Sequence, residues 1–223
     1  MASIELEFFA PYNEEAALIG DFSNWEPLGM SKGEDGVFRV SVELEDGVYA
    51  YKFRVRSKSW FLEPDAWVDV VDPYATVVND DAQASGVLRI EGGRRILDAY
   101  RWQHDDVHLP SDHELVIYEL HVGDFSGGEG EPDGDDRGTY AHVTEKLDYL
   151  QELGVNALEL MPVKEYPGSY SWGYNPRYFM AAESSYGPTE DLKRLVDEAH
   201  GRGMRVIMDG VYNHSDSSAP LTQ

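Results

Sequence analysis

The sequence predicts a multi-domain protein in which an all-β immunoglobulin-like sandwich precedes the first three βα units of a (β/α)8 TIM barrel. Three observations predict this fold class. Apolar and polar residues alternate in short segments of residues 1–90, the pattern of half-buried antiparallel strands. From about residue 115, strand and helix patterns follow one another instead, as in parallel βαβ units. The sequence stops soon after the third such strand, so we expect a truncated barrel.

Three segments of the first ninety residues are typical of strands. They are residues 4–8, 37–44 and 49–55, and turns rich in Gly and Asp separate them. Strands of this kind, at spacings of about 8–12 residues, predict an antiparallel sandwich. No segment in this part of the chain has a helical pattern. Residues 91–114 read as a linker, and residues 115–223 read as the second domain.

The second domain begins with a strand at residues 116–120. A helix is predicted over residues 140–153, with Thr139 as its N-cap and Gly154 as its stop. The next strand covers residues 155–161. A second helix covers residues 189–200 and a third strand covers residues 204–208, with Pro188 and the pair Gly201 and Gly203 marking the ends of that helix.

A parallel sheet needs cover on both faces, and no helix follows the third strand in this sequence. We therefore expect that five further units of the barrel are missing. A small doubly wound domain is the alternative. Its usual phosphate-binding fingerprint does not occur in the sequence.

The amino-acid composition disfavours several classes of binding partner. The 42 acidic and 18 basic residues leave a net charge of −24, which disfavours nucleic acid and anionic lipid. No apolar run reaches the length of about 18–20 residues that spans a bilayer. The sequence contains no cysteine and does not begin with a secretory signal pattern, so we expect a cytoplasmic protein. A neutral sugar polymer is not repelled by such a surface.

Polar residues follow each predicted parallel strand. His121 and Asp124 follow the first strand, a long loop follows the second, and Asp209 and His214 follow the third. Ligands of a barrel bind at this C-terminal edge. The second loop is rich in aromatic side chains, Trp172 among them, and in hydrogen-bonding groups, a composition that suits a carbohydrate. The alternative is a loop that packs its own aromatic side chains. His121 is expected to be buried and hydrogen-bonded rather than catalytic.

The strings VIYELHVGDFS, GTYAHVTEKLDYLQELGVNALELMPVKEYPG and SWGYNPRYFMAAESSYGPTEDLKRLVDEAHGRGMRVIMDGVYNH resemble the start of the catalytic barrel in the α-amylase superfamily of glycoside hydrolases. The likeness is greatest to its trehalohydrolase, pullulanase, isoamylase and branching-enzyme group. It implies that Tyr174 stacks on a sugar, that His214 hydrogen-bonds the sugar hydroxyls and that Asp209 braces the site. Asn213 matches a position that ligates calcium in many members. The acid-rich stretch 124–136 reads as a solvated loop, and no cofactor is required.

The strings FFAPYNEEAALIGDFSNWEP, DGVYAYKFRVRSKSW and DPYATVVND resemble the glycogen-binding β-sandwich that precedes the barrel in branching and debranching enzymes. The resemblance implies a glycan-binding surface at Trp25, Trp60, Lys52 and Asn79. The alternative for the two tryptophans is packing within the sandwich or against the barrel.

A retaining glycosidase needs two carboxyl groups about 5–5.5 Å apart. In the resembled family they follow the fourth and fifth strands, so we expect the nucleophile and the general acid beyond residue 223. The chain is interpreted as the N-terminal portion of a hydrolase or transglycosylase acting on starch, glycogen or maltooligosaccharides, and inactive alone. A non-catalytic α-glucan-binding protein and an unrelated interaction module stay open as alternatives.

Overall fold

The computed structural model describes residues 1–60, 62–63, 65–79, 84–97, 99–126, 137–168 and 170–222. The chain divides into two compact units. A sandwich unit contains Met1–Ala99 together with Ser217–Gln223, and an α/β unit contains Tyr100–Asp216. The sandwich unit extends past residue 90, where the sequence pattern placed the end of the first domain, because its sheet continues through a strand at Gly86–Glu91 and a short strand at Arg94–Arg95.

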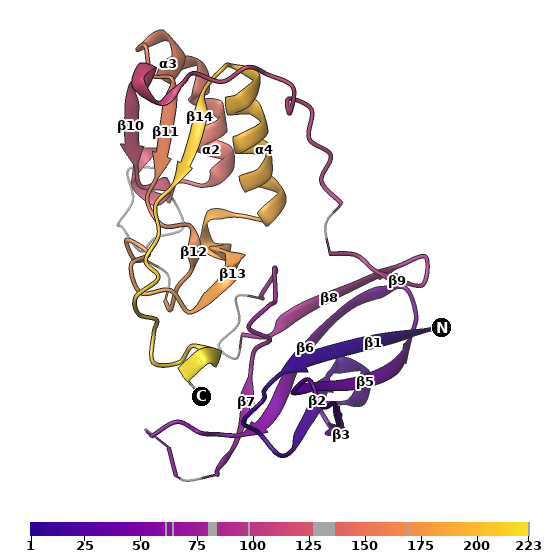
Figure 1. The fold of residues 1–223 in the computed structure, drawn as a ribbon. Helices are drawn as coiled ribbons and strands as arrows, with labels where there is room; N and C mark the ends of the chain where they lie inside the picture. Colours follow the sequence, from indigo (N-terminus) through magenta and orange to yellow (C-terminus); the bar gives the residue numbers. More distant parts are fainter. Residues whose placement is uncertain are drawn as a thin grey trace. The chain divides into compact units, whose positions relative to one another are not determined.

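Two antiparallel sheets form the sandwich unit (Figure 1). One sheet has the order β1 (Ala2–Phe9), β5 (Val37–Leu44), β4 (Ser31–Lys32). The other has the order β3 (Leu28–Gly29), β2 (Ala16–Gly20), β6 (Gly47–Arg56), β8 (Gly86–Glu91), β9 (Arg94–Arg95), and β7 (Trp67–Val70) also pairs with β6. The three predicted strands are confirmed as β1, β5 and β6. A short 3-10 helix, η1 (Asp21–Ser23), follows β2.

The core of this unit lies between the two sheets and takes residues from both. Ile4, Leu6 and Phe8 alternate with exposed residues along β1 and are buried, as the alternation in the sequence predicts. The Phe8 ring stacks on Phe53 of the other sheet with 4.4 Å between ring centroids. Burial of one such side chain contributes about 1.5–3 kcal/mol. Strand β2 is buried at all its positions, so it lacks the alternation that would have predicted it.

Three parallel strands form the sheet of the α/β unit, in the order β10 (Ile117–Leu120), β11 (Ala157–Leu160), β14 (Arg205–Met208). The helices between them are α1 (Val122–Phe125), α2 (Tyr140–Glu145), α3 (Leu147–Glu152) and α4 (Thr189–Gly201). A hairpin of β12 (Lys164–Glu165) and β13 (Tyr178–Ala182) follows β11. Short 3-10 turns lie at η2 (Asp112–Glu114) and η3 (Ser184–Tyr186), and η4 (Pro220–Thr222) belongs to the sandwich unit.

The helix boundaries follow the predicted signals, with one exception. The Thr139 hydroxyl accepts a hydrogen bond from the His142 N–H at 3.3 Å, as an N-cap does. Gly154 ends the helical segment at a φ of +90°, a conformation that glycine adopts without strain. The predicted continuous helix is wrong at Lys146, whose N–H bonds the Val143 carbonyl three residues back and separates α2 from α3.

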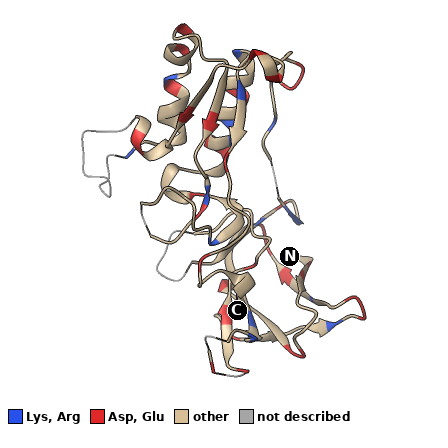
Figure 2. Ribbon diagram, turned by 60° about the vertical axis from the view of Figure 1, so that its left-hand side comes forward, with Lys and Arg blue, Asp and Glu red and all other residues tan. Residues whose placement is uncertain are grey.

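The helices cover one face of the parallel sheet (Figure 1). Leu158 and Leu160 of β11 point into that core and are fully buried. On the opposite face Ile117 is 49% exposed, and Glu119 pairs in register with Glu159 on the neighbouring strand. Acidic residues therefore lie on the strands of this unit as well as in its loops (Figure 2). Within the described residues, no helix has both the length and the apolar character that a membrane span requires.

Candidate functional site

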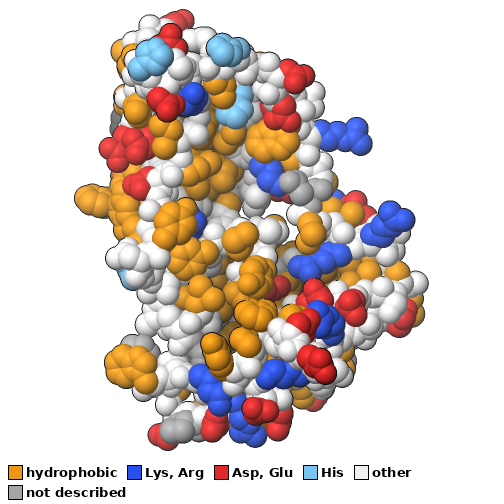
Figure 3. All heavy atoms as spheres, viewed as in Figure 1, with side chains coloured by type: hydrophobic (Ala, Val, Ile, Leu, Met, Phe, Trp, Pro, Cys, Tyr) orange, Lys and Arg blue, Asp and Glu red, His pale blue; other side chains and the backbone are white. Residues whose placement is uncertain are grey.

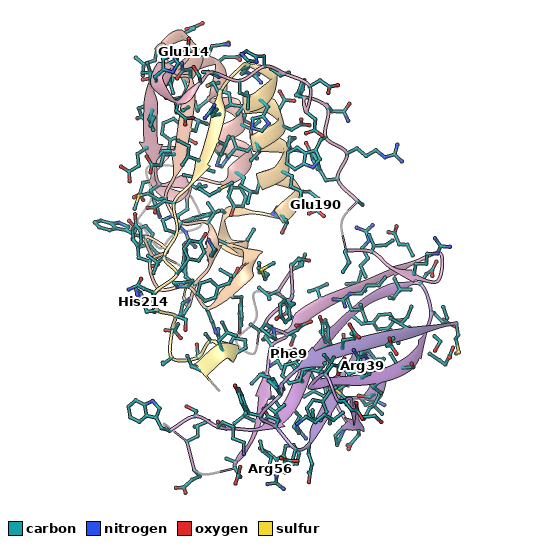
Figure 4. The ribbon with its side chains drawn as sticks, viewed as in Figure 1. Phe9, Arg39, Arg56, Glu114, Glu190 and His214 are labelled. Atoms are coloured by element: carbon teal, nitrogen blue, oxygen red, sulfur yellow. The ribbon has the colours of Figure 1, made fainter. Side chains whose placement is uncertain are left out.

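Loops gather at the C-terminal ends of the three parallel strands. The Met161 N–H bonds the last carbonyl of β10, that of Leu120, at 3.0 Å. The Asp209 N–H bonds the last carbonyl of β11, that of Leu160, also at 3.0 Å. These bonds bring the chain segments that leave β11 and β14 to one edge of the sheet, where Figure 4 labels His214.

Three of the predicted site residues meet at this edge. The Tyr174 hydroxyl, from the loop between β12 and β13, donates a hydrogen bond to Asp209 Oδ2 at 2.5 Å. His214 Nε2 donates to the Tyr174 carbonyl oxygen at 2.7 Å. Asp209 and His214 both follow β14, so the loop that joins them is fixed to Tyr174 at both ends. This arrangement is called the strand-end site below.

Carboxylates dominate the electrostatics of the strand-end site. The hydrogen bond to Asp209 raises the pKa of Tyr174 to about 12, with burial and the charge of Asp209 adding to the shift and with smaller contributions from Glu119 and Glu159. The hydroxyl therefore stays protonated near neutral pH and keeps donating to Asp209. As a result, the phenol ring has a fixed orientation in which it can contact a ligand.

Trp172 stands beside Tyr174 in the same loop and is 61% exposed. The next residue, Gly173, has a φ of +81° and no room for a side chain, because a Cβ atom would lie 2.5 Å from the Pro162 carbonyl oxygen. The Gly173 N–H also bonds the Ser171 hydroxyl at 3.0 Å. This tight passage determines the path of the chain between Trp172 and Tyr174.

His121, the residue after β10, supports the same loop. It is 7% exposed, and its Nε2 lies 2.8 Å from the Tyr186 hydroxyl and 3.0 Å from the Ser171 carbonyl oxygen. The prediction that His121 is buried and hydrogen-bonded is confirmed. The exposed Asp124 accepts from the Tyr170 hydroxyl at 3.3 Å. The rest of the acid-rich stretch, residues 127–136, lies outside the described residues.

Two buried glutamates escaped the sequence analysis. Glu183, 1% exposed, accepts hydrogen bonds from the backbone N–H groups of Tyr166 and Ser185, each at 3.1 Å. Glu165, 7% exposed, accepts from the Ser184 N–H at 2.8 Å. The signal for Glu183 is its place before two serines, where a carboxylate can cap a short turn. Glu183 thus holds the start of the loop that carries Tyr174, and Glu165 holds the η3 turn that follows β13.

Two known families match parts of this chain. Residues 124–221 match the family described as alpha amylase, catalytic domain. Residues 2–75 match carbohydrate-binding module 48, the isoamylase N-terminal domain. The chain belongs to the α-amylase superfamily. Its two matched regions are a module-48 sandwich and part of an α-amylase catalytic domain.

The relatives of this α-amylase-superfamily chain include a trehalohydrolase and a branching enzyme. Malto-oligosyltrehalose trehalohydrolase of Saccharolobus solfataricus is 34% identical over 213 residues, which cover 95% of this chain and 33% of that protein. A 1,4-alpha-glucan-branching enzyme of Yarrowia lipolytica is 32% identical over 219 residues, which cover 96% of this chain and 30% of that protein. The chain thus spans about a third of the length of these relatives.

A solved structure shows the same fold. Pullulanase type I from Bacillus subtilis, complexed with maltose, matches with a TM-score of 0.78 and 28% identity over 99% of this chain and 33% of that one. The family likeness therefore rests on both sequence and fold.

Asn213 is the predicted calcium ligand. Its side chain is exposed, and it precedes His214 in the sequence. Among the described residues, no group of three or more His, Cys, Asp or Glu side chains could hold a metal ion. The part of the chain that the structure describes therefore shows no cluster of the carboxylates that calcium prefers, and calcium binding at Asn213 stays a prediction. No step of the chemistry below uses a metal ion.

The four predicted glycan-binding residues of the module-48 sandwich come from separate segments. Lys52 lies on β6 and alternates with the buried Tyr51 and Phe53, so it faces away from the core. Trp25 follows η1, with a φ of +63° and 39% exposure. Trp60 lies in the loop after β6 and is 84% exposed. The Asn79 side chain accepts from the Ser85 N–H at 2.6 Å. A shared glycan surface stays a prediction.

Proposed function

We propose that this chain is the N-terminal part of an α-glucan-active hydrolase or transglycosylase whose substrates are starch, glycogen or maltooligosaccharides. In this proposal the α/β unit supplies the first three βα units of a (β/α)8 barrel. The observation that carries the proposal is the contact of Tyr174 with both Asp209 and His214 at the C-terminal edge of the parallel sheet. Ligands of barrels bind at that edge. The named activities of the relatives support the substrate class.

Each residue of the strand-end site has a physical role in sugar binding. The Tyr174 ring offers an apolar face to the CH groups of a glucosyl residue. Asp209 holds the phenol in place through its hydrogen bond. His214 uses Nε2 for the Tyr174 carbonyl, which leaves Nδ1 for a sugar hydroxyl. Trp172 adds an exposed aromatic surface in the same loop.

The chemical step needs groups that we assign to polypeptide beyond this sequence. A retaining glycosidase uses one carboxylate as nucleophile and one carboxylic acid as proton donor, about 5–5.5 Å apart. None of the described carboxylates takes either role in this proposal. Asp209 is occupied by Tyr174, and Glu165 and Glu183 are occupied by backbone N–H groups. The cysteine-free composition supports a cytoplasmic location.

Titration with maltotetraose, followed by calorimetry, tests the proposal. The Tyr174→Ala variant should bind at least about tenfold more weakly, a loss of about 1.4 kcal/mol. Tyr149→Ala is the matched control, because Tyr149 is 56% exposed on α3. It should bind like the unaltered chain. His214→Ala should also bind more weakly, and the urea unfolding curves of both variants are compared with that of the unaltered chain to exclude misfolding. No binding by the unaltered chain, or equal binding by Tyr174→Ala, would overturn the proposal.

A second candidate function is α-glucan binding by the sandwich at Trp25, Trp60, Lys52 and Asn79. The observation that favours it is the match of residues 2–75 to carbohydrate-binding module 48, together with the 84% exposure of Trp60, whose ring offers an apolar face to a sugar. The paired variant Trp25→Ala/Trp60→Ala should lose affinity for maltoheptaose, whereas Tyr174→Ala should not affect this binding. Unchanged affinity in the paired variant would exclude the sandwich surface.

A further inference from the structure

Tyr212 is an exposed aromatic side chain that the strand-end site does not use. Its side chain is 73% exposed, and it lies in the loop after β14, between Asp209 and His214. Figure 3 shows that hydrophobic side chains are frequent on the surface of the α/β unit, so exposure alone would mean little. The contacts of Tyr212 make it different from a free surface side chain.

Two strands hold the Tyr212 ring in place, and a glycine in its own loop leaves room for it. Lys164 of β12 donates from Nζ to the Tyr212 hydroxyl at 3.0 Å, and the same ammonium group lies 4.5 Å from the ring centroid. Phe179 of β13 stacks on the ring, with 6.4 Å between centroids and an interplanar angle of 26°. A Cβ atom at Gly210 would lie 2.9 Å from the phenol, so the absence of a side chain there makes room for the ring.

A fixed and exposed ring is suited to binding. Ordering a rotamer-rich side chain costs about 0.5–1.5 kcal/mol when a ligand binds. For Tyr212 these contacts restrict the ring before any ligand arrives. Cation–π contact and a hydrogen bond to the same ammonium group also keep Lys164 beside the ring, where it can donate to a further hydroxyl.

The position of Tyr212 ties it to the strand-end site. Asp209 bonds the hydroxyl of Tyr174 and His214 bonds the carbonyl of the same residue. Tyr212 is two residues from His214, and two residues of chain span at most about 7 Å between Cα atoms. A ligand of several glucosyl residues that touches Tyr174 can therefore extend to Tyr212.

We propose that Tyr212 and Lys164 form a second glucosyl-binding position next to the strand-end site. This inference rests on the proposed α-glucan function. The Tyr212 ring contacts the CH face of a glucosyl residue, and the Lys164 ammonium group donates to one of its hydroxyls. The ligand is a neutral α-linked glucose chain long enough to reach both Tyr174 and Tyr212.

The test compares maltose with maltotetraose on the full chain by calorimetry. In the unaltered chain maltotetraose should bind more tightly than maltose, because only the longer ligand reaches both positions. Tyr212→Ala should weaken maltotetraose binding by about tenfold and leave maltose binding within about twofold. Tyr212→Phe keeps the ring and should retain most of the affinity. Lys164→Met should give an intermediate loss for maltotetraose.

The controls separate this inference from the proposed function. Gly210→Ala should reproduce the loss of affinity seen for Tyr212→Ala, because its Cβ displaces the ring. Tyr149→Ala should change the affinity for neither maltose nor maltotetraose. Each variant is compared by its urea unfolding curve. Equal losses for both ligands, or no loss in Tyr212→Ala, would overturn the second position while the proposed function stands. If the unaltered chain binds neither sugar, the proposed function fails and the inference falls with it.

Discussion

The two units of the chain bury apolar side chains alike, but they differ in the charged groups that they bury. Among the described residues of the sandwich unit, the buried charged side chain is Asp72, which accepts from the Tyr51 hydroxyl at 2.6 Å. Burial and the charge of Asp72 raise the pKa of Tyr51 well above its usual range. The α/β unit buries Glu165, Glu183 and Asp197.

The difference follows from where backbone N–H groups find partners. In the sandwich, neighbouring strands satisfy most of them. In the α/β unit, long segments leave the sheet, and their N–H groups need other acceptors. Glu183 accepts from Tyr166, at the start of the loop of Tyr174, and from Ser185 of η3, and Glu165 accepts from Ser184 of η3. Asp197 of α4 accepts from Gln103 and His104. Buried carboxylates thus supply acceptors where the chain of the α/β unit has left its sheet, including the start of the loop of Tyr174.

The first test of this comparison removes a buried apolar side chain from the core of the sandwich unit. Leu18 of β2 is fully buried, so Leu18→Ala should cost about 2–5 kcal/mol of unfolding free energy, through lost contacts and the cavity that remains. Urea unfolding followed by circular dichroism measures the change. Val48→Ala is the control, because Val48 is 66% exposed and should change stability by less than about 0.5 kcal/mol. Similar losses in both variants would contradict the assigned core.

The second test removes a buried carboxylate of the α/β unit. Glu183→Ala leaves the N–H groups of Tyr166 and Ser185 without their acceptor. We expect a loss of about 2–4 kcal/mol, since each buried unsatisfied group costs about 1–3 kcal/mol. Glu190→Ala, on the exposed surface of α4 (labelled in Figure 4), should have almost no effect. The idea that carboxylates shape this loop fails if urea unfolding shows no difference between the two variants.

The third test uses pH. Burial alone would raise the pKa of Asp197, but hydrogen bonds from the Gln103 and His104 N–H groups and the Tyr100 hydroxyl outweigh it and lower the pKa. A lowered folded-state pKa stabilises the protein above the unfolded pKa of about 3.9, and this contribution is lost as the pH falls through the folded value. Asp197→Asn should therefore cost about 1–3 kcal/mol at pH 7 and progressively less below pH about 4.

The control for Asp197 is Asp148→Asn. Asp148 makes an exposed ion pair with Arg202, and such pairs contribute about 0–1 kcal/mol. The unfolding free energies of both variants and of the unaltered chain are measured between pH 7 and pH 3. A constant difference between Asp197→Asn and the unaltered chain over this range would show that the carboxylate charge is not what the N–H groups recognise.

The fourth test has the smallest expected effect and measures the pKa of Tyr174 in the strand-end site. Asp209→Asn removes the charge and weakens the acceptor that raise the pKa of Tyr174 to about 12. The pKa of Tyr174 should move toward the usual value of about 10. A titration followed by NMR of 13Cζ-labelled tyrosine measures it, and Asp148→Asn should leave it unchanged. If the pKa of Tyr174 stays near 12 in Asp209→Asn, the hydrogen bond between Tyr174 and Asp209 is not the cause of the raised pKa.

Local patterns were enough where neighbours in sequence are neighbours in space. The alternation of Ile4, Leu6 and Phe8 predicted β1, and the Thr139 hydroxyl caps the helix that it was expected to cap. The same logic failed at Lys146, where one tighter turn divides the helix while Val143 and Leu147 stay buried. The periodicity of apolar residues shows which side chains are buried. It does not reveal a single change in backbone hydrogen-bond spacing, because the same side chains stay buried on either side of it.

The sequence by itself determined which residues stand at the end of each parallel strand, because strand length and alternation are local properties of the chain. Only the tertiary structure decided that the Tyr174 hydroxyl meets Asp209, that His214 turns to the Tyr174 carbonyl, and that Lys164 and Phe179 hold the Tyr212 ring. These partners are separated by more than thirty residues of sequence. Their contacts depend on the register of the sheet and the path of two loops, which no local pattern encodes.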